Sequence, residues 1–253
     1  MLSLTLPVAA SAKTITMSGS TSVYPLAVKL AKAYNKKTKG KTKFKIAQGG
    51  SDIGIEDSAR GRVVLGNASR DPQAGDPGGI VFNKIARDAL CVATNKSNAL
   101  ANLSQAQIEA IFAGQIKRWN DVPGAQVTGP INLYVRTPAS GTQDAFREIF
   151  MGNTSVTGSA SQKASNGVVQ QSIKSDPNGI GYVSIAFTKG IAATPYNGVA
   201  CTLRNAKSGR YGGSRNFWMV SRGKAKGDAK KFLKWARKDK KARKIVNSEW
   251  VAL

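Results

Sequence analysis

The 253-residue sequence predicts an α/β fold built on a mostly parallel sheet. Short β-prone segments alternate with segments whose apolar residues recur at helical spacing. Small polar residues separate several of these strands from the helices that follow them. The length suits one large domain or two modest ones, and a hydrophobic content of 41% is enough to build folded cores.

The N-terminal third is expected to contain three strands and two helices. A strand over 14–17 leads through a Gly-Ser-Thr-Ser loop to a helix with Pro25 in its first turn and one apolar face: Leu26, Leu30, Ala33 and Tyr34. A second strand begins at Phe44 and is followed by a helix that starts near Ser51. A third strand over 63–66 ends in a polar loop, Ala68-Ser69-Arg70-Asp71.

The remainder of the chain continues the alternation. An extended segment over 85–94 precedes a capping box, Ser104 to Gln107, that opens a helix ending before Gly114. A strand over 131–135 delivers Arg136 and the loop 139–142, and another helix follows as far as Gly152. We then expect a helix near 168–173, strands over 179–187 and 217–220, and a last helix on Ala229, Phe232, Leu233 and Ala236.

The first twelve residues resemble the end of a secretory signal. They are apolar and finish in Ala10-Ser11-Ala12, a small-x-small pattern that signal peptidase accepts. The alternative is an ordinary buried first strand. No other stretch reaches the roughly 18 consecutive apolar residues of a membrane helix. We therefore expect residues 1–12 to be a signal-peptide remnant and the protein to be soluble and periplasmic or otherwise extracytoplasmic.

Composition excludes several classes of enzyme. The sequence has no histidine, which removes Ser-His and Cys-His nucleophiles and His-ligated zinc, iron or haem. No nucleophile with an adjacent base is visible, so we expect neither catalysis nor a cofactor. Cys91 and Cys201 are the only cysteines, and they suit one long-range disulfide or two buried thiols.

The polar loops at the strand ends suggest an anion site. Ligands of open α/β sheets bind beyond the carboxyl ends of strands, where helix N-termini present free N–H groups. The loops supply two charges and seven hydroxyls: Arg70, Arg136, Ser20, Thr21, Ser22, Ser51, Ser69, Ser140 and Thr142. Each serine taken singly is more often a helix cap than a ligand. Neither GxxxxGK[ST] nor GxGxxG occurs in these loops, so a nucleotide site is not indicated.

Ordered motifs over residues 14–250 resemble one known family. They are Gly19-Ser20-Thr21-Ser22-Val23-Tyr24-Pro25, Gln48-Gly49-Gly50-Ser51-Asp52-Ile53-Gly54-Ile55, Ala68-Ser69-Arg70, Arg136 with Ser140-Gly141-Thr142, Gly179-Ile180-Gly181-Tyr182-Val183 and the closing stretch from Arg215. This set resembles the phosphate-binding receptors of phosphate ABC importers, which are periplasmic-binding-protein-like.

The resemblance implies a two-lobed fold of type II, with mixed, mostly parallel sheets and a ligand cleft between the lobes. Lobe I would comprise residues 13–88 plus 193–253, and lobe II residues 89–192. Inorganic phosphate or a similar oxyanion would bind in the cleft to the hydroxyls and arginines above and to Gly141. An ABC permease and its ATPase would be the partners of a monomeric receptor, and Cys91 would lie near enough to Cys201 for a disulfide.

Two departures from the family bear on selectivity. Some members have a ligand-binding aspartate where this chain has Ser69, and an acid where it has Pro138. A carboxylate accepts the proton of phosphate and repels sulfate, which has none, whereas a hydroxyl serves both anions. Asp52, Asp71 and Asp144 are candidate replacements for that acceptor.

The chain carries an unusually large positive charge. Lys and Arg number 38 against 14 Asp and Glu, a formal net charge of +24. A charge run is usually a solvated helix face. The alternative function is a polyanion-binding envelope protein that uses this surface for nucleic acid, an acidic polymer or anionic lipid. The four tryptophans are scattered, so we expect no specific nucleic-acid partner.

Overall fold

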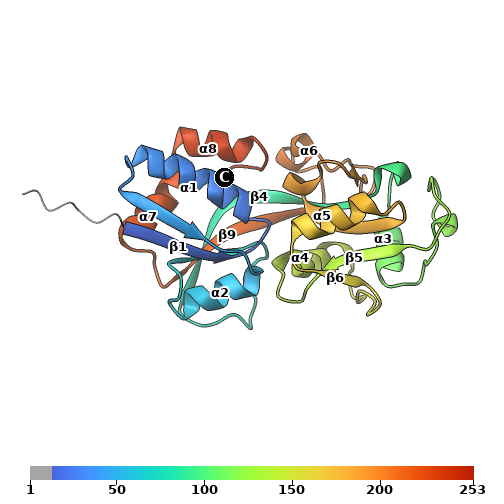
Figure 1. The fold of residues 1–253 in the computed structure, drawn as a ribbon, viewed down its shortest axis with the longest axis horizontal. Helices are drawn as coiled ribbons and strands as arrows, with labels where there is room; N and C mark the ends of the chain where they lie inside the picture. Colours follow the sequence, from blue (N-terminus) through green and yellow to red (C-terminus); the bar gives the residue numbers. More distant parts are fainter. Residues whose placement is uncertain (1–12) are drawn as a thin grey trace, which may run out of the picture.

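A computed structural model describes residues 13–253, so the predicted signal segment lies outside the described residues. Nine strands form one mixed sheet in the order β2-β1-β3-β9-β4-β7-β5-β6, with β8 beside β4. Figure 1 shows the strands and helices in two groups joined by the long strands β4 (Ile80–Thr94) and β9 (Ser214–Arg222). Each group has its own hydrophobic core, which confirms the two-lobed α/β prediction.

Lobe I is formed by both ends of the described chain. Its strands are β1 (Lys13–Gly19), β2 (Thr42–Ile46) and β3 (Leu65–Ala68), and β1 runs parallel to both neighbours. Its helices are α1 (Tyr24–Lys37), α2 (Ser51–Ala59), α7 (Gly227–Lys238) and α8 (Lys240–Asn247). Leu26, Phe232 and Trp250 share one core cluster, because the apolar faces of α1, α7 and the C-terminal segment all turn toward the sheet.

Lobe II is formed by the part of the chain that lies between the two long strands in the sequence. Its strands are β5 (Asn132–Arg136), β6 (Ser161–Lys163), β7 (Gly179–Ser184) and β8 (Ala192–Ala193). Its helices are α3 (Gln105–Phe112), α4 (Gly141–Phe150), α5 (Asn166–Ser175) and α6 (Leu203–Lys207), with short 3₁₀ turns at Lys96–Asn98, Trp119–Asp121 and Ile185–Phe187. The ring of Phe146 stacks on Tyr182 with centroids 3.9 Å apart, which fixes α4 against β7.

The long strands connect the lobes. The first part of β4 pairs antiparallel with β9, and its end pairs antiparallel with β7. Cys91, near the end of β4, is disulfide-bonded to Cys201, and the Cα–Cα distance is 5.7 Å. The disulfide prediction is therefore confirmed. None of the helices in residues 13–253 combines the length and the apolar character needed to cross a membrane.

The structure adds detail that the sequence did not show. The sheet is mixed and not mostly parallel as expected: four strand pairings are parallel and four antiparallel, because the two connecting strands pair antiparallel with their neighbours. The helix expected on Ala229 to Ala236 is α7, and an additional helix, α8, follows it after Asp239, which caps α8 through its side chain. Short elements β6, β8 and α6 were not expected.

One lobe boundary also differs from the expectation. Residues 193–213 were assigned to lobe I, but Tyr196, Cys201, Ala206 and Tyr211 are buried in the core cluster of lobe II. Figure 1 places α6 on the same side of the molecule as α5. The disulfide and these aromatic contacts hold this segment against lobe II, and the chain returns to lobe I only with β9.

Candidate functional site

Helix N-termini from both lobes meet where the lobes touch. The loop 20–23 precedes α1, and α2 begins at Ser51; both belong to lobe I. From lobe II, α4 begins after the N-cap Ser140 and α5 after the N-cap Ser165. The first N–H groups of a helix have no partner within it, and they lie at the positive end of its dipole. The junction therefore favours an anion.

Glycines allow the two lobes to approach closely at this junction. The N–H of Asp52 donates to the carbonyl of Ala139 across the interface at 3.2 Å. Gly50 has a φ of 108°, and a Cβ there would clash with the Ala139 carbonyl. A Cβ on Gly141 would clash in the same way with the Ser51 hydroxyl. The lobes are thus closed onto each other, and larger residues at either glycine would separate them.

The predicted hydroxyls form a buried cluster at the closed interface. Ser22 Oγ lies 2.8 Å from Thr142 Oγ1, which links lobe I to lobe II. Ser20 Oγ donates to Ser69 Oγ at 2.8 Å, and the Ser69 N–H donates to Ser51 Oγ at 3.0 Å. All seven predicted hydroxyls are buried, and Ser140 Oγ accepts from the Thr142 N–H as the cap of α4. Hydroxyls both donate and accept, so the cluster can reorient toward a ligand.

Arg136 carries an unbalanced charge into this cluster. Its side chain donates to Thr21 Oγ1 at 3.0 Å and to the carbonyls of Lys163 and Ala164. The residue is only 2% exposed, and no carboxylate of the described residues forms an ion pair with it. Burial lowers the pKa of Arg136 to about 10. A bound anion would offset this cost of burial.

A second buried arginine was missed as a site residue in the sequence analysis. Arg215 of β9 stands opposite Asp88 of β4 in the strand register, and Arg215 Nη2 lies 2.9 Å from an Asp88 carboxylate oxygen. Arg215 Nη2 also donates to Ser22 Oγ at 2.9 Å. Complete burial raises the pKa of Asp88, and the hydrogen bond from Ser184 opposes that rise. The 127 positions between the partners left no local signal in the sequence.

Asn166 was also missed. Its Nδ2 donates to Thr21 Oγ1 and to Ser22 Oγ, both at 2.8 Å, and its Oδ1 accepts from the Ser184 N–H. It opens α5 directly after the N-cap Ser165. A polar residue after a helix cap could have identified it, but the surrounding stretch is so rich in Ser, Asn, Gln and Gly that this signal does not stand out.

Arg70 takes a different position from the other predicted ligands. Its guanidinium forms ion pairs with Asp76 at 2.6 Å, Asp52 at 3.0 Å and Asp144 at 3.4 Å. Because Asp144 belongs to α4, this cluster joins lobe I to lobe II beside the hydroxyls. Burial and the nearby Asp52 charge raise the pKa of Asp144 to about 6, and Arg70 opposes that rise. Arg70 is therefore an interlobe latch in this closed state.

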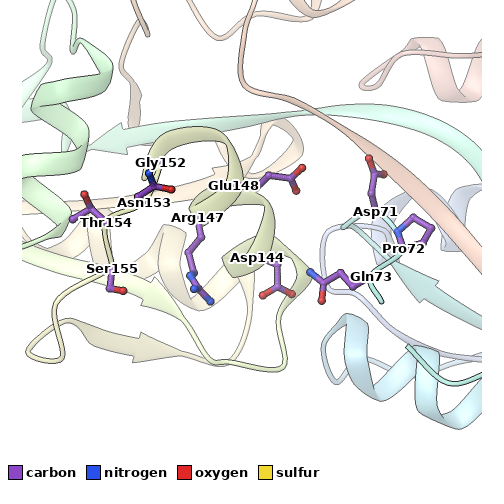
Figure 2. Close-up of a pocket in the computed structure, with 10 residues that line it drawn as sticks. All are labelled: Asp71, Pro72, Gln73, Asp144, Arg147, Glu148, Gly152, Asn153, Thr154 and Ser155. Atoms are coloured by element: carbon purple, nitrogen blue, oxygen red, sulfur yellow. The ribbon is translucent and has the colours of Figure 1, made fainter. Parts of the chain in front are cut away.

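A polar groove of about 450 Å³ opens beside the latch. Figure 2 shows Asp144 and Arg147 of α4 on one side of it, and Asp71, Pro72 and Gln73 of lobe I on the other. The groove follows the boundary between the lobes, and none of its lining residues belongs to the hydroxyl cluster.

Comparison with known proteins assigns the family. A family model described as the PBP superfamily domain matches residues 6–240. This chain belongs to the PBP superfamily. This match and the relatives of this chain confirm the family resemblance seen in the sequence.

Among these relatives is the phosphate-binding protein PstS of Bacillus subtilis, which is 24% identical over 240 residues, or 93% of this chain and 79% of that protein. The protein of the same name from Staphylococcus epidermidis is 27% identical over 241 residues, or 87% of this chain and 73% of that protein. Both alignments extend across both lobes of the PBP-superfamily fold.

Solved structures give the same assignment. A substrate-binding protein of a phosphate ABC transporter from Clostridium perfringens, solved with bound phosphate, has a TM-score of 0.89 and 28% identity, covering 95% of this chain and all of that one. An ABC-type phosphate transport receptor from Vibrio cholerae has a TM-score of 0.74 and 25% identity, covering 94% of this chain and all of that one. The two-lobed PBP-superfamily architecture is therefore shared along nearly the whole chain.

Proposed function

We propose that this protein is an extracytoplasmic receptor that captures inorganic phosphate between its lobes and delivers it to an ABC importer. The observation that carries the proposal is the buried, unbalanced charge of Arg136 among hydroxyls from both lobes. A buried charge without a counter-ion is costly, and an anion held at Arg136 would remove that cost. Its oxygens would accept hydrogen bonds from the same hydroxyls.

The composition of the site favours a tetrahedral oxyanion. Seven buried hydroxyls and the Asn166 amide offer many hydrogen-bond donors at the junction of the lobes, whereas a planar carboxylate would leave several of them unpaired. Ser69 also offers a hydroxyl, which accepts sulfate, at the position where the aspartate of some family members would reject it. We therefore expect phosphate to bind best and sulfate to compete measurably.

Delivery to a transporter follows from the two-lobed construction. The ligand would be enclosed by contacts from both lobes, such as Ser22 with Thr142, and release requires those contacts to separate. Relatives whose names describe phosphate ABC transport share this architecture. A permease that holds the lobes apart, driven by its ATPase, would empty the site. The protein itself acts as a carrier and not as a catalyst.

The test is titration calorimetry of the purified protein with phosphate, arsenate, sulfate and tungstate. We expect one site per chain, tight binding of phosphate and arsenate, and weaker binding of sulfate. A parallel assay should find no hydrolysis of a phosphate ester. Binding of none of the four anions, or hydrolysis that exceeds the rate in buffer, would contradict the proposal.

A further inference from the structure

The positive charge of the chain is concentrated in lobe I. By the packing described above, lobe I comprises residues 13–88 and 214–253, which contain 27 Lys and Arg against 9 Asp and Glu. Residues 89–213 contain 11 Lys and Arg against 5 Asp and Glu. The proposed phosphate site uses only two arginines of this large excess, Arg136 and Arg215. Most of the charge therefore has no role in the site.

Fifteen of the 27 Lys and Arg of lobe I lie on four neighbouring elements. Every Lys and Arg of α1, β2, α7 and α8 is exposed, and these residues are called the basic surface below. The elements adjoin, because Tyr34 of α1 contacts Phe44 of β2 and Trp235 of α7. Figure 1 shows α1 and α8 side by side at the outer part of lobe I. The basic surface is thus continuous over α1, α7 and α8.

Acidic residues do little to neutralise the basic surface. Residues 221–253 contain three acids, Asp228, Asp239 and Glu249, and each already faces a lysine. On α7 and α8, by contrast, Lys234 follows Lys230 and Lys244 follows Lys240 at the i, i+4 spacing. Like charges at this spacing destabilise a helix. The fold gains nothing from these repulsions, which favours a role of the charge in binding a polyanion.

We propose that the basic surface binds a flexible linear polyanion, inorganic polyphosphate. Lys43 and Lys45 alternate along β2 with Phe44 and Ile46, which pack on the side of α1 and α7. The side chains of the two lysines therefore point to the opposite face of the sheet, at its edge. A flexible chain can follow charge around this edge, whereas a flat bilayer or a stiff duplex reaches one side at a time.

The absence of anchoring groups supports the same choice. No aromatic side chain is among the exposed large hydrophobic residues of the part of the chain described here, and Val28 is the one on α1. Stacking on bases requires exposed aromatic rings, and insertion into a bilayer requires an exposed apolar face. The basic surface therefore offers charge alone, and it would bind phosphate groups without recognising bases.

The test measures binding of an end-labelled, long-chain inorganic polyphosphate by fluorescence anisotropy over a range of sodium chloride. One variant removes four charges from the basic surface: Lys32→Gln, Lys36→Gln, Lys234→Gln and Lys241→Gln. The matched control removes four exposed lysines of lobe II: Lys96→Gln, Lys117→Gln, Lys174→Gln and Lys189→Gln. The two variants have the same net charge and differ only in where the charge was lost.

We expect the wild-type protein to bind with a steep salt dependence. In the basic-surface variant, affinity at low salt should fall at least tenfold, and the slope of log K against log salt should decrease by up to about 3, since each contact contributes about 0.7 for a single strand. The control should stay within about threefold of wild type. Arg136→Ala should bind polyphosphate normally, which separates this surface from the phosphate site.

Three results would overturn the proposal. Equal loss in the control would show that net charge alone attracts the polymer. Binding to anionic phospholipid vesicles but not to polyphosphate would assign the basic surface to a membrane. A duplex DNA that binds as tightly as the flexible chain would remove the argument from the sheet edge. Unchanged phosphate calorimetry in both lysine variants would show that they fold.

Discussion

Replacement of Arg136 by alanine is the most direct test of how the site binds an anion. The guanidinium is held by the carbonyls of Lys163 and Ala164, while its Nη1 faces Thr21 among the hydroxyls. We therefore expect a bound phosphate to accept one or two charge-assisted hydrogen bonds from this side chain. Arg136→Ala removes those bonds and leaves the hydroxyls in place.

The magnitude follows from the number of bonds. A hydrogen bond to a charged group contributes about 1.5 to 3 kcal/mol, and each 1.4 kcal/mol is tenfold in affinity. One lost bond therefore weakens phosphate binding roughly 10- to 100-fold, and two bonds weaken it more. Arg136→Lys keeps the charge but cannot reproduce the planar array of donors, so it should recover only part of the loss.

Two assays measure this loss. Calorimetry gives the dissociation constant, and the rise in unfolding temperature with phosphate gives an independent value through ligand-linked stabilisation. The control is Arg118→Ala, which removes an exposed arginine of lobe II. Arg136→Ala with wild-type affinity in both assays would show that Arg136 does not contact the anion, and the proposed site would be refuted.

Three further predictions concern the latch, the disulfide and the surface charge. The pKa of Asp144 is raised from its ordinary 3.8 to about 6, so its ionisation costs stability as pH rises above about 4 and costs most above pH 6. Asp144→Asn should therefore raise the free energy of unfolding at pH 7.5 by about 1 to 2 kcal/mol, a value that is reduced because the side chain is partly exposed. At pH 4 the substitution should leave the free energy of unfolding unchanged, and urea titrations at both pH values test this. Cys91→Ala with Cys201→Ala should lower the urea-derived free energy of unfolding by about 2 to 5 kcal/mol, and a smaller loss would mean that the disulfide adds little to lobe II. Added sodium chloride should slow phosphate association in stopped-flow measurements more than it speeds dissociation. The reason is that salt screens the charges of exposed lysines beyond roughly 8 Å and screens the closed site much less; the reverse result would place surface lysines against the bound anion.

Local signals in the sequence predicted the elements whose ends carry the hydroxyls. The capping box from Ser104 to Gln107 is present as expected, with both of its hydrogen bonds. Strand ends before Ser51 and Ser140 were also readable, because apolar runs stop there and small polar residues follow. These features depend on neighbours in the chain, so their physical basis is visible without a fold.

Features that depend on tertiary packing were not predictable in the same way. Arg70 and Arg136 look alike in sequence, since each follows a strand end, yet Arg70 is surrounded by Asp52, Asp76 and Asp144, and Arg136 has no carboxylate partner in the described chain. The difference arises from where the loop 71–76 and α4 place their acids. A latch and an anion ligand were therefore indistinguishable before the structure.

Asp88 and Arg215 show why the connecting strands matter to the site. They pair across β4 and β9, where the two lobes join, and their remaining contacts reach in opposite directions. Arg215 donates to Ser22 of lobe I, and Asp88 accepts from Ser184 of lobe II. One buried ion pair thus contacts a hydroxyl in each lobe. Because Asp88 balances Arg215, Arg136 is the buried arginine of the hydroxyl cluster that has no carboxylate partner in the described residues. Under the proposed function, the lobes would move about the same two strands to release the anion that Arg136 holds.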